Sequence, residues 1–344
     1  MNALIVGGGI AGISTAIQLI KRGVSVTLVD PGVNQSTAVA AGLINPIVFR
    51  RTTKSWRADD FIPYLKGFYQ ELEIESQTKF FHPLKIRRVF SSNQERNDWK
   101  KKQVRVDYQQ FLEQINTPDD NYNLVACPFG SARLANCFWV NSLEFMRGGK
   151  SFIEKKGTWK NEPFQFPLYD ASSKTYLGET YTCVIFCEGY QVKNNPLFNS
   201  LAISPTKGQV LTIESPLIPE DESLNRKCFI LPLGEHRFKI GSTYEWENSD
   251  NSITEEGKQL ILENLRVLIE ETPHVIGQEA GIRPTTIDRR PFIGEHTSFK
   301  GNYIFNGLGT KGYMIAPLLS QELTALLLDG IELDPEVAVY RREK

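Results

Sequence analysis

The most constraining feature of the sequence is a glycine-rich turn between two apolar runs in the first thirty residues. The runs span 2–6 and 24–29, and the sequence GGGIAG occupies 7–12 between them. Apolar side chains after the turn repeat at helical spacing, at Ile13, Ala16, Ile17 and Ile20. The pattern predicts a strand, a helix and a second parallel strand, the unit that binds the pyrophosphate of a dinucleotide.

Each glycine of the turn has a physical role. Gly7 permits the tight turn, Gly9 lets a pyrophosphate approach the backbone, and Gly12 lets the helix pack closely on the strand. The unpaired N–H groups at the start of the helix then face the phosphates. Asp30 closes the second run, where a carboxylate can accept hydrogen bonds from ribose hydroxyls and repel a 2′-phosphate. The motif therefore predicts an unphosphorylated adenosine ribose and does not distinguish FAD from NAD.

Composition narrows the class of protein further. A chain of 344 residues has room for two domains, and a net charge of −1 gives no bulk attraction to nucleic acid or membrane. The five cysteines form no C-x-x-C pair and the four histidines have no metal-ligand spacing, so we expect reduced thiols and no metal. No apolar stretch is long enough to span a membrane and the N-terminus lacks a basic leader, so we expect a soluble, cytoplasmic protein.

The middle of the chain predicts a cofactor domain built from separate segments. Small residues are dense at 37–46, which suggests a second segment along the cofactor with Ser36 or Thr37 near the phosphates. We expect helices at 59–75 and 141–155, strands with turns at 121–140, and a buried strand within 181–190. The last of these ends at a glycine and returns the chain to the parallel sheet.

A mostly antiparallel sheet is predicted beyond residue 200. Its strands are expected at 207–213, 228–233 and 238–246. Alternation in the last strand places five side chains on one face, namely Phe238, Ile240, Ser242, Tyr244 and Trp246. Thr254 is expected to cap a helix that Pro273 stops.

The stretch 79–105 is strongly basic. We interpret it as a solvated face, because runs of charged residues usually lie on the solvent-exposed surface of a protein. An RNA-binding role for this stretch is the competing interpretation.

A second strand, glycine loop and helix lie near the C-terminus. A segment rich in arginine and proline at 280–294 precedes a strand at 302–306, the loop GLGTKGY at 307–313 and a helix that ends near Gly330. A helix N-terminus at the far end of the cofactor suits a ring that becomes anionic on reduction. A flavin meets that condition, whereas nicotinamide loses its positive charge on accepting hydride.

Taken together, the chain resembles the FAD-dependent D-amino acid oxidase family, which includes glycine oxidase and sarcosine oxidase. The resemblance runs over essentially the whole length. It depends on the order and spacing of GGGIAG with Asp30, VAAGLINP (39–46), KGQVLTI (207–213), FILP to KIGSTYE (229–245), AGIRPTTIDRRPFIG (280–294) and GLGTKGYMIAPLLSQELTALL (307–327). It implies an α/β (α+β) fold, in which a Rossmann-like FAD-binding domain carries an inserted, mostly antiparallel substrate sheet. We assign 1–58, 138–200 and 281–344 to the FAD domain and 59–137 and 201–280 to the substrate domain.

The resemblance also implies roles for individual residues. Arg283 would bind a substrate carboxylate, Tyr244 would face the substrate, and Lys311 would stabilise negative charge on the reduced ring. The loop contains no cysteine, so non-covalent FAD is expected. The expected cofactor-binding residues are Gly7, Gly9, Ile10, Ala11, Gly12, Asp30, Pro31, Ser36, Thr37, Ala41, Gly42, Leu43, Gly189, Gly309, Thr310, Lys311, Gly312 and Tyr313.

The implied activity is oxidation of the C–N bond of a small amino acid or N-substituted glycine. Hydride would pass to the flavin and the resulting imine would hydrolyse, with O2 or another carrier as the final electron acceptor. A similar glycine loop occurs in the oxidase domain of the bifunctional enzyme that matures 5-methylaminomethyl-uridine in tRNA, which makes a tRNA-modifying oxidase a second candidate. A nicotinamide-dependent dehydrogenase and a non-catalytic flavin-binding protein are weaker candidates.

Overall fold

The N-terminal unit has the predicted form in the computed structural model, which describes residues 1–33, 36–115, 127–270 and 272–341. Strand β1 (Asn2–Val6) leads through the glycine turn into helix α1 (Ile10–Lys21) and parallel strand β2 (Ser25–Val29). The expected strand within 181–190 is β12 (Cys183–Phe186), which pairs in parallel with β1. The part of the predicted 121–140 segment from 121 to 126 lies outside the described residues.

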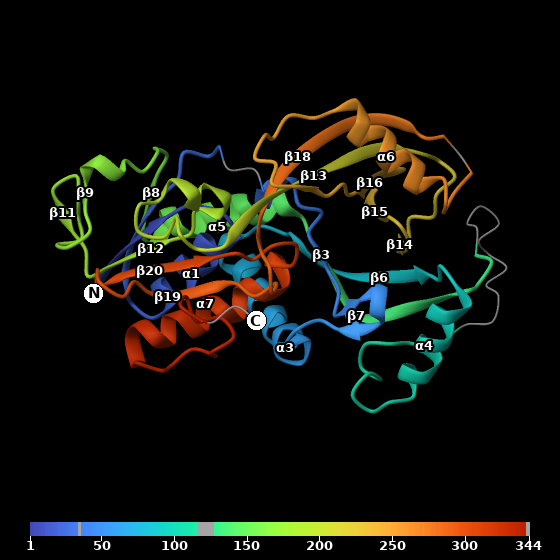
Figure 1. Ribbon diagram of the computed structural model, residues 1–344, viewed down its shortest axis with the longest axis horizontal. Coiled ribbons are helices and arrows are strands. Elements are labelled where there is room, and N and C mark those ends of the chain that lie inside the picture. The colour runs from blue at the N-terminus through green and yellow to red at the C-terminus, as the bar shows by residue number, and fades with distance from the viewer. Residues whose placement is uncertain (34–35, 116–126, 271, 342–344) are drawn as a thin grey trace.

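The sheet around β1 is completed by distant segments, as predicted. Its strand order is β19-β20-β12-β1-β2-β8, with β20 (Asn302–Asn306) parallel to β12 and β19 (Phe292–Glu295) antiparallel at one edge. Strand β8 (Thr158–Lys160) forms the other edge. The first and last quarters of the chain therefore share one sheet, in which β12 lies between β20 and β1 (Figure 1).

Long helices pack beside this sheet and against one another. They are α1, α3 (Ala58–Ser76), α5 (Ser142–Lys156) and α7 (Gly312–Asp329). Their shared core is apolar and fully buried, and it includes Ile13, Ile17, Phe61, Leu65, Phe145 and Leu319. The start of α7 lies next to the start of α1, because a Cβ atom on Gly312 would lie 3.2 Å from the Ile10 side chain.

A second sheet, of nine strands, lies beside the first along the long axis of the molecule (Figure 1). Its path is β17-β13-β16-β15-β14-β6-β7-β3, and β18 pairs with β13. The strands are β3 (Leu43–Ile44), β6 (Phe81–Val89), β7 (Ser131–Val140), β13 (Ile203–Glu214), β14 (Ser223–Asn225), β15 (Phe229–Gly234), β16 (Arg237–Gly241), β17 (Glu245–Trp246) and β18 (His274–Thr286). Helix α6 (Glu255–Leu265) covers one face, where Ile261 and Leu265 join a separate apolar core.

The remaining elements are short, apart from helix α4. They are α2 (Ser36–Val39), β4 (Ile47–Val48), η1 (Phe49–Arg51), β5 (Thr53–Lys54), α4 (Asn93–Gln103), η2 (Phe166–Leu168), β9 (Tyr169–Asp170), β10 (Thr175–Tyr176), β11 (Glu179–Thr180) and η3 (Gly189–Asn194). Within the described residues, no helix is long and apolar enough to cross a membrane.

The prediction of one continuous strand over 238–246 is wrong. Val210 of β13 pairs with Gly241 and Lys207 pairs with Glu245, so three steps along β13 match four steps along its partner. The extra residue is a β-bulge, which reverses the alternation beyond it. Phe238 and Ile240 are therefore buried in the core under α6, whereas Ser242 and Tyr244 line a cavity on the opposite face.

The boundaries of two other predicted features also differ from expectation. The Thr254 hydroxyl does cap α6 by accepting a hydrogen bond from the Gly257 N–H, but the helix ends at Leu265, well before Pro273. The predicted domain boundaries at 137/138 and 280/281 fall inside β7 and β18. The division into two domains stays a prediction.

The interpretation of 79–105 as a solvated face is wrong for its two central arginines. Arg87 is fully buried and its guanidinium pairs with the Glu222 carboxylate. Arg88 is 6% exposed and pairs with Glu95 at 2.6 Å. Burying a charge is unfavourable unless it is paired and hydrogen-bonded, so these two arginines are structural.

Candidate active site

The glycine turn builds a cradle with no room for a side chain. Gly7 has a φ of +105°, and a Cβ atom on Gly12 would lie 1.8 Å from the Gly7 carbonyl oxygen. A Cβ on Gly9 would come within 3.1 Å of the Thr37 hydroxyl, which accepts a hydrogen bond from the Ile10 N–H at 3.0 Å. The backbone N–H groups at the start of α1 and the Thr37 side chain therefore border the same space.

Asp30 holds the turn itself. Its carboxylate accepts a hydrogen bond from the Gly8 N–H at 2.5 Å and another from the Gly32 N–H at 2.6 Å. The residue is 5% exposed at the end of β2, the position predicted for a ribose contact. The contact with a ribose stays a prediction.

One cavity runs from this cradle to the second sheet. Most residues predicted to bind cofactor or substrate line it, namely Gly9, Ile10, Ala11, Ser36, Thr37, Ala41, Gly42, Leu43, Gly189, Tyr244, Arg283, Gly309, Thr310, Lys311, Gly312 and Tyr313. Gly7, Gly12, Asp30 and Pro31 do not line it. Gly7, Gly12 and Asp30 belong to the turn and its support, whereas Pro31 is exposed. The structure thus brings the two predicted glycine loops together.

The second glycine loop closes the cavity at the start of α7. Gly309 donates its N–H to the Pro284 carbonyl at 2.9 Å, which ties the loop to β18. Tyr313 is buried, and its hydroxyl donates to the Thr37 carbonyl at 3.0 Å, which links α7 to α2. Thr37 therefore links the two loops, because its carbonyl accepts from Tyr313 and its hydroxyl accepts from the Ile10 N–H.

Lys311 is a half-buried cation on this wall. Its Nζ donates to the Asn45 carbonyl at 3.0 Å and to the Asn45 Oδ1 at 3.3 Å. Burial, reinforced by the nearby Arg289 charge, lowers the pKa of Lys311 to about 8. Its ammonium therefore loses its proton close to neutral pH, unlike that of an exposed lysine.

Arg283 projects from β18 into the cavity. Its Nη2 donates to the Ser242 hydroxyl at 2.8 Å, its Nη1 donates to the Thr243 carbonyl at 3.4 Å, and the guanidinium lies 4.7 Å from the centre of the Tyr244 ring. The approach requires Gly208 on the neighbouring strand, where a Cβ would lie 2.1 Å from Nη2. Among the described residues no carboxylate pairs with Arg283, and burial lowers its pKa. The cavity therefore contains a guanidinium that a carboxylate ligand can pair with.

Another part of the cavity wall was not predicted from the sequence. It includes Phe49, Asn225 and Phe229. Arg88 organises two of these residues, because its Nη1 donates to the Asn225 Oδ1 at 2.7 Å and its guanidinium lies 5.0 Å from the centre of the Phe49 ring. The only sequence feature that involves this part of the wall is the basic stretch 79–105, which contains Arg88, and that stretch was interpreted as a solvated face.

The cavity fits a flavin dinucleotide. One end is a side-chain-free cradle at a helix N-terminus, which suits a pyrophosphate. The other end is a second helix N-terminus with Lys311, which suits an electron-rich ring. Beside that end, Arg283 and Tyr244 leave a place for a carboxylate-bearing ligand.

Comparison with known proteins defines the class. The sequence model of the FAD dependent oxidoreductase family, DAO, matches residues 2–326. The chain therefore belongs to that family and is an FAD-dependent oxidoreductase. This confirms the predicted family, fold class and cofactor.

Particular relatives then place the chain within the family. It is 25% identical to the uncharacterized oxidoreductase YurR of Bacillus subtilis over 98% of this chain and 97% of that protein. It is 24% identical to the tRNA 5-methylaminomethyl-2-thiouridine biosynthesis bifunctional protein MnmC of Marinobacter nauticus over 93% of this chain, which spans 54% of that longer protein. The fold matches glycine oxidase from Geobacillus kaustophilus with a TM-score of 0.83 and 19% identity, over 99% of each chain.

Proposed function

We propose that the protein oxidises the C–N bond of a small amino acid or N-substituted glycine. The observation that supports this most strongly is the guanidinium of Arg283, which faces the cavity without a carboxylate partner among the described residues. An α-carboxylate would supply that partner and would form two parallel charge-assisted hydrogen bonds. The chemistry that bound, non-covalent FAD supplies is acceptance of a hydride from the carbon next to the amine.

The chain's own residues would orient the substrate. Arg283 would hold the carboxylate, and the Tyr244 ring would keep the guanidinium in place. The apolar side chains of Phe49 and Phe229 would enclose the N-substituent and exclude water. Positioning of this kind accounts for a large part of a barrier when the reacting atoms are held close together. No acid–base pair is needed, provided that the substrate amine is neutral when it binds.

The test is an anaerobic screen of the purified holoenzyme against glycine, N-alkyl glycines and D- and L-amino acids. We expect at least one of these compounds to remove the visible absorbance of oxidised flavin, with ammonia or a primary amine as a product. Retention of yellow FAD with every compound would contradict the proposal and favour a non-catalytic flavin-binding protein.

A second candidate is oxidation of a carboxymethylamino group on a tRNA base. Two observations favour it: the similarity to MnmC over 93% of the chain, and the exposed lysines Lys79, Lys85, Lys100 and Lys101 that remain on the basic stretch. The same Arg283 would bind the carboxymethyl group. Incubation with tRNA carrying that modification should then convert the base, with affinity that falls steeply as salt is raised. Unchanged tRNA would exclude this candidate.

A further inference from the structure

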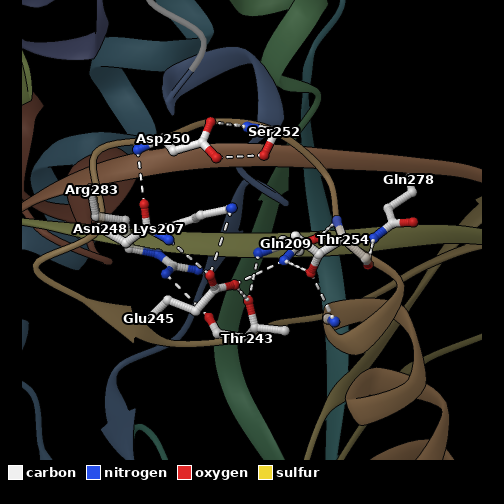
Figure 2. A network of polar contacts seen from close by, with 11 residues as sticks. Lys207, Gln209, Thr243, Glu245, Asn248, Asp250, Ser252, Thr254, Gln278 and Arg283 are labelled. Carbon is white, nitrogen blue, oxygen red and sulfur yellow. Dashed lines mark hydrogen bonds and ion pairs between the residues drawn. The ribbon is translucent and has the colours of Figure 1, made fainter.

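The loop that contacts Arg283 is held by one buried glutamine. Ser242 and Thr243 accept the two hydrogen bonds of Arg283, and both belong to the bulge between β16 and β17. The residues of this bulge do not continue the regular backbone pairing with β13, which ends at Gly241 and resumes at Glu245. Figure 2 shows that Gln209 of β13 lies at the centre of the polar contacts that secure it.

Every polar group of Gln209 has a partner. Its Nε2 donates to the Glu245 Oε1 at 2.8 Å and to the Thr254 Oγ1 at 3.0 Å. Its Oε1 accepts from the Thr254 N–H at 2.9 Å and from the Gln278 Nε2 at 2.8 Å. Its own N–H donates to the Thr243 Oγ1 at 2.9 Å, and its carbonyl accepts from the Thr243 N–H at 3.2 Å. Gln209 therefore clamps the residues on both sides of Tyr244.

Gln209 does not itself touch the cavity. Successive strand residues point to opposite faces, so Gly208 and Val210 line the cavity while Gln209 is fully buried on the other face. There it lies under the first turn of α6, where a Cβ on Gly257 would lie 2.3 Å from its Nε2. Any effect of Gln209 on substrate must therefore act through the bulge.

We propose that Gln209 is a positioning residue that fixes Ser242, Thr243 and Tyr244 around Arg283 and so sets the affinity for the substrate carboxylate. The inference rests on the proposed function. Removal of the Gln209 amide would take the hydrogen-bond donor from the Glu245 carboxylate and the Thr254 hydroxyl, and the acceptor from the Thr254 N–H. The bulge would then sample positions in which it no longer holds Arg283. At saturating substrate the bound carboxylate itself would pair with Arg283 and hold it in place, so substrate affinity should change more than the limiting rate.

The first test compares the wild-type holoenzyme with Gln209→Leu. We expect KM for the best N-alkyl glycine and Kd for acetate, read from the flavin spectrum, each to rise about tenfold, which is the effect of losing roughly one to two buried hydrogen bonds. The limiting rate of flavin reduction should stay within about twofold. Gln18→Leu is the matched control, because Gln18 is a buried glutamine of α1 that donates to the Tyr64 hydroxyl at 2.9 Å. It should lower stability but leave KM unchanged.

The second test is Gln209→Glu, which gives a signature that a general packing defect would not. Three charged groups lie on the same face of β13 as Gln209. They are Glu245 of β17, Lys207 of β13, which lies 3.6 Å from Glu245, and Asp250 of the loop near Lys207. The neighbouring residues Thr254, which caps α6, and Gln278 of β18 are neutral. A carboxylate at 209 would repel Glu245 at neutral pH. Protonation of one of the two acids would restore the hydrogen bond, so the excess KM should disappear below about pH 5 in Gln209→Glu but not in Gln209→Leu.

The outcomes separate the inference from the function it rests on. Wild-type enzyme that turns over an N-alkyl glycine, together with Gln209→Leu that has an unchanged KM or loses only limiting rate, would overturn the inference alone. If Gln209→Leu does not fold, a ratio of the Gln209→Glu KM to the wild-type KM that stays the same at every pH would overturn it instead. Wild-type holoenzyme that neither oxidises an amine nor binds acetate would overturn the proposed function, and the inference with it.

Discussion

Arg283 is a cation 4.7 Å from the centre of a tyrosine ring, with two neutral oxygens as its hydrogen-bond acceptors. A buried charge usually has a compensating charge nearby, because desolvation is otherwise unfavourable. Within the described residues the cavity wall offers none, and a second cation, Lys311, lines the same cavity. At the scale of single residues, the cavity is therefore built for an anionic ligand.

The lowered pKa of Lys311 predicts a pH dependence of the reaction. The protonated amine carries the charge that would stabilise a reduced ring, and it is lost as pH rises through about 8. Lys311→Arg keeps its charge over the whole range. The ratio of the wild-type to the Lys311→Arg rate of flavin reduction should therefore fall as pH rises from about 7 to 9.

Dividing the two rates removes the titration of the substrate amine, which both enzymes share. Stopped-flow reduction at saturating substrate gives the ratio directly. A ratio independent of pH would show that the Lys311 charge has no part in the reaction.

At the scale of elements, the glycine turn illustrates why dinucleotide binding could be predicted. Gly7, Gly9, Gly12 and Asp30 belong to one continuous unit of strand, turn, helix and strand, so their local spacing determines their geometry. The second glycine loop was predictable for the same reason. Both elements depend on contacts between residues that are near neighbours in sequence.

Elements set by distant partners could not be predicted in this way. The bulge at Ser242–Tyr244 exists only relative to β13, and alternation within its own segment gives the opposite face. Arg87 was taken for a surface residue because its partner, Glu222, lies far along the chain. The wall of Phe49 and Asn225 depends in turn on Arg88, so it too was missed.

The cradle predicts the effect of one added methyl group. Gly9→Ala would place a Cβ 3.1 Å from the Thr37 hydroxyl at the phosphate end of the cavity. We expect the Kd for FAD to rise about tenfold or more, while the free energy of unfolding of the apoprotein changes by less than about 1 kcal/mol. Titration of apoprotein with FAD, followed by flavin fluorescence, measures this.

Gly67→Ala in α3 is the matched control, since a Cβ there meets nothing within 4 Å. It should bind FAD as the wild type does and gain about 0.5–1 kcal/mol of stability from the better helix propensity. Equal FAD affinity in Gly9→Ala and wild type would show that the turn does not bind the phosphates.

At the scale of the whole molecule, the cavity lies where two sheets built from separate segments meet. The N-terminal turn, α2 and the start of α7 supply part of its lining, and β13, β14, β15 and β18 supply another part. The position of the second sheet therefore matters for the site. Glu222, just before β14, helps to hold the strands of this sheet together, because its carboxylate pairs with Arg87 of β6 and with Arg133 of β7, the latter at 2.7 Å.

Loss of the Glu222 charge should destabilise the protein. Glu222→Gln would leave the buried Arg87 guanidinium without its counter-charge, and we expect the free energy of unfolding to fall by about 3–5 kcal/mol. Glu71→Gln breaks the exposed pair with Lys21 and should change it by no more than about 1 kcal/mol. Urea denaturation measures both, and equal effects of the two substitutions would refute a structural role for the buried pair.

The most direct measurement is anaerobic reduction of the holoenzyme by its best N-alkyl glycine, with wild type and Arg283→Ala compared over a range of substrate concentrations. Loss of a charged, bidentate contact predicts that the variant needs about 10- to 100-fold more substrate for half-maximal reduction and still binds FAD. Half-maximal reduction at the same concentration in both enzymes would contradict the account, because the substrate would then not be held by its carboxylate in this cavity.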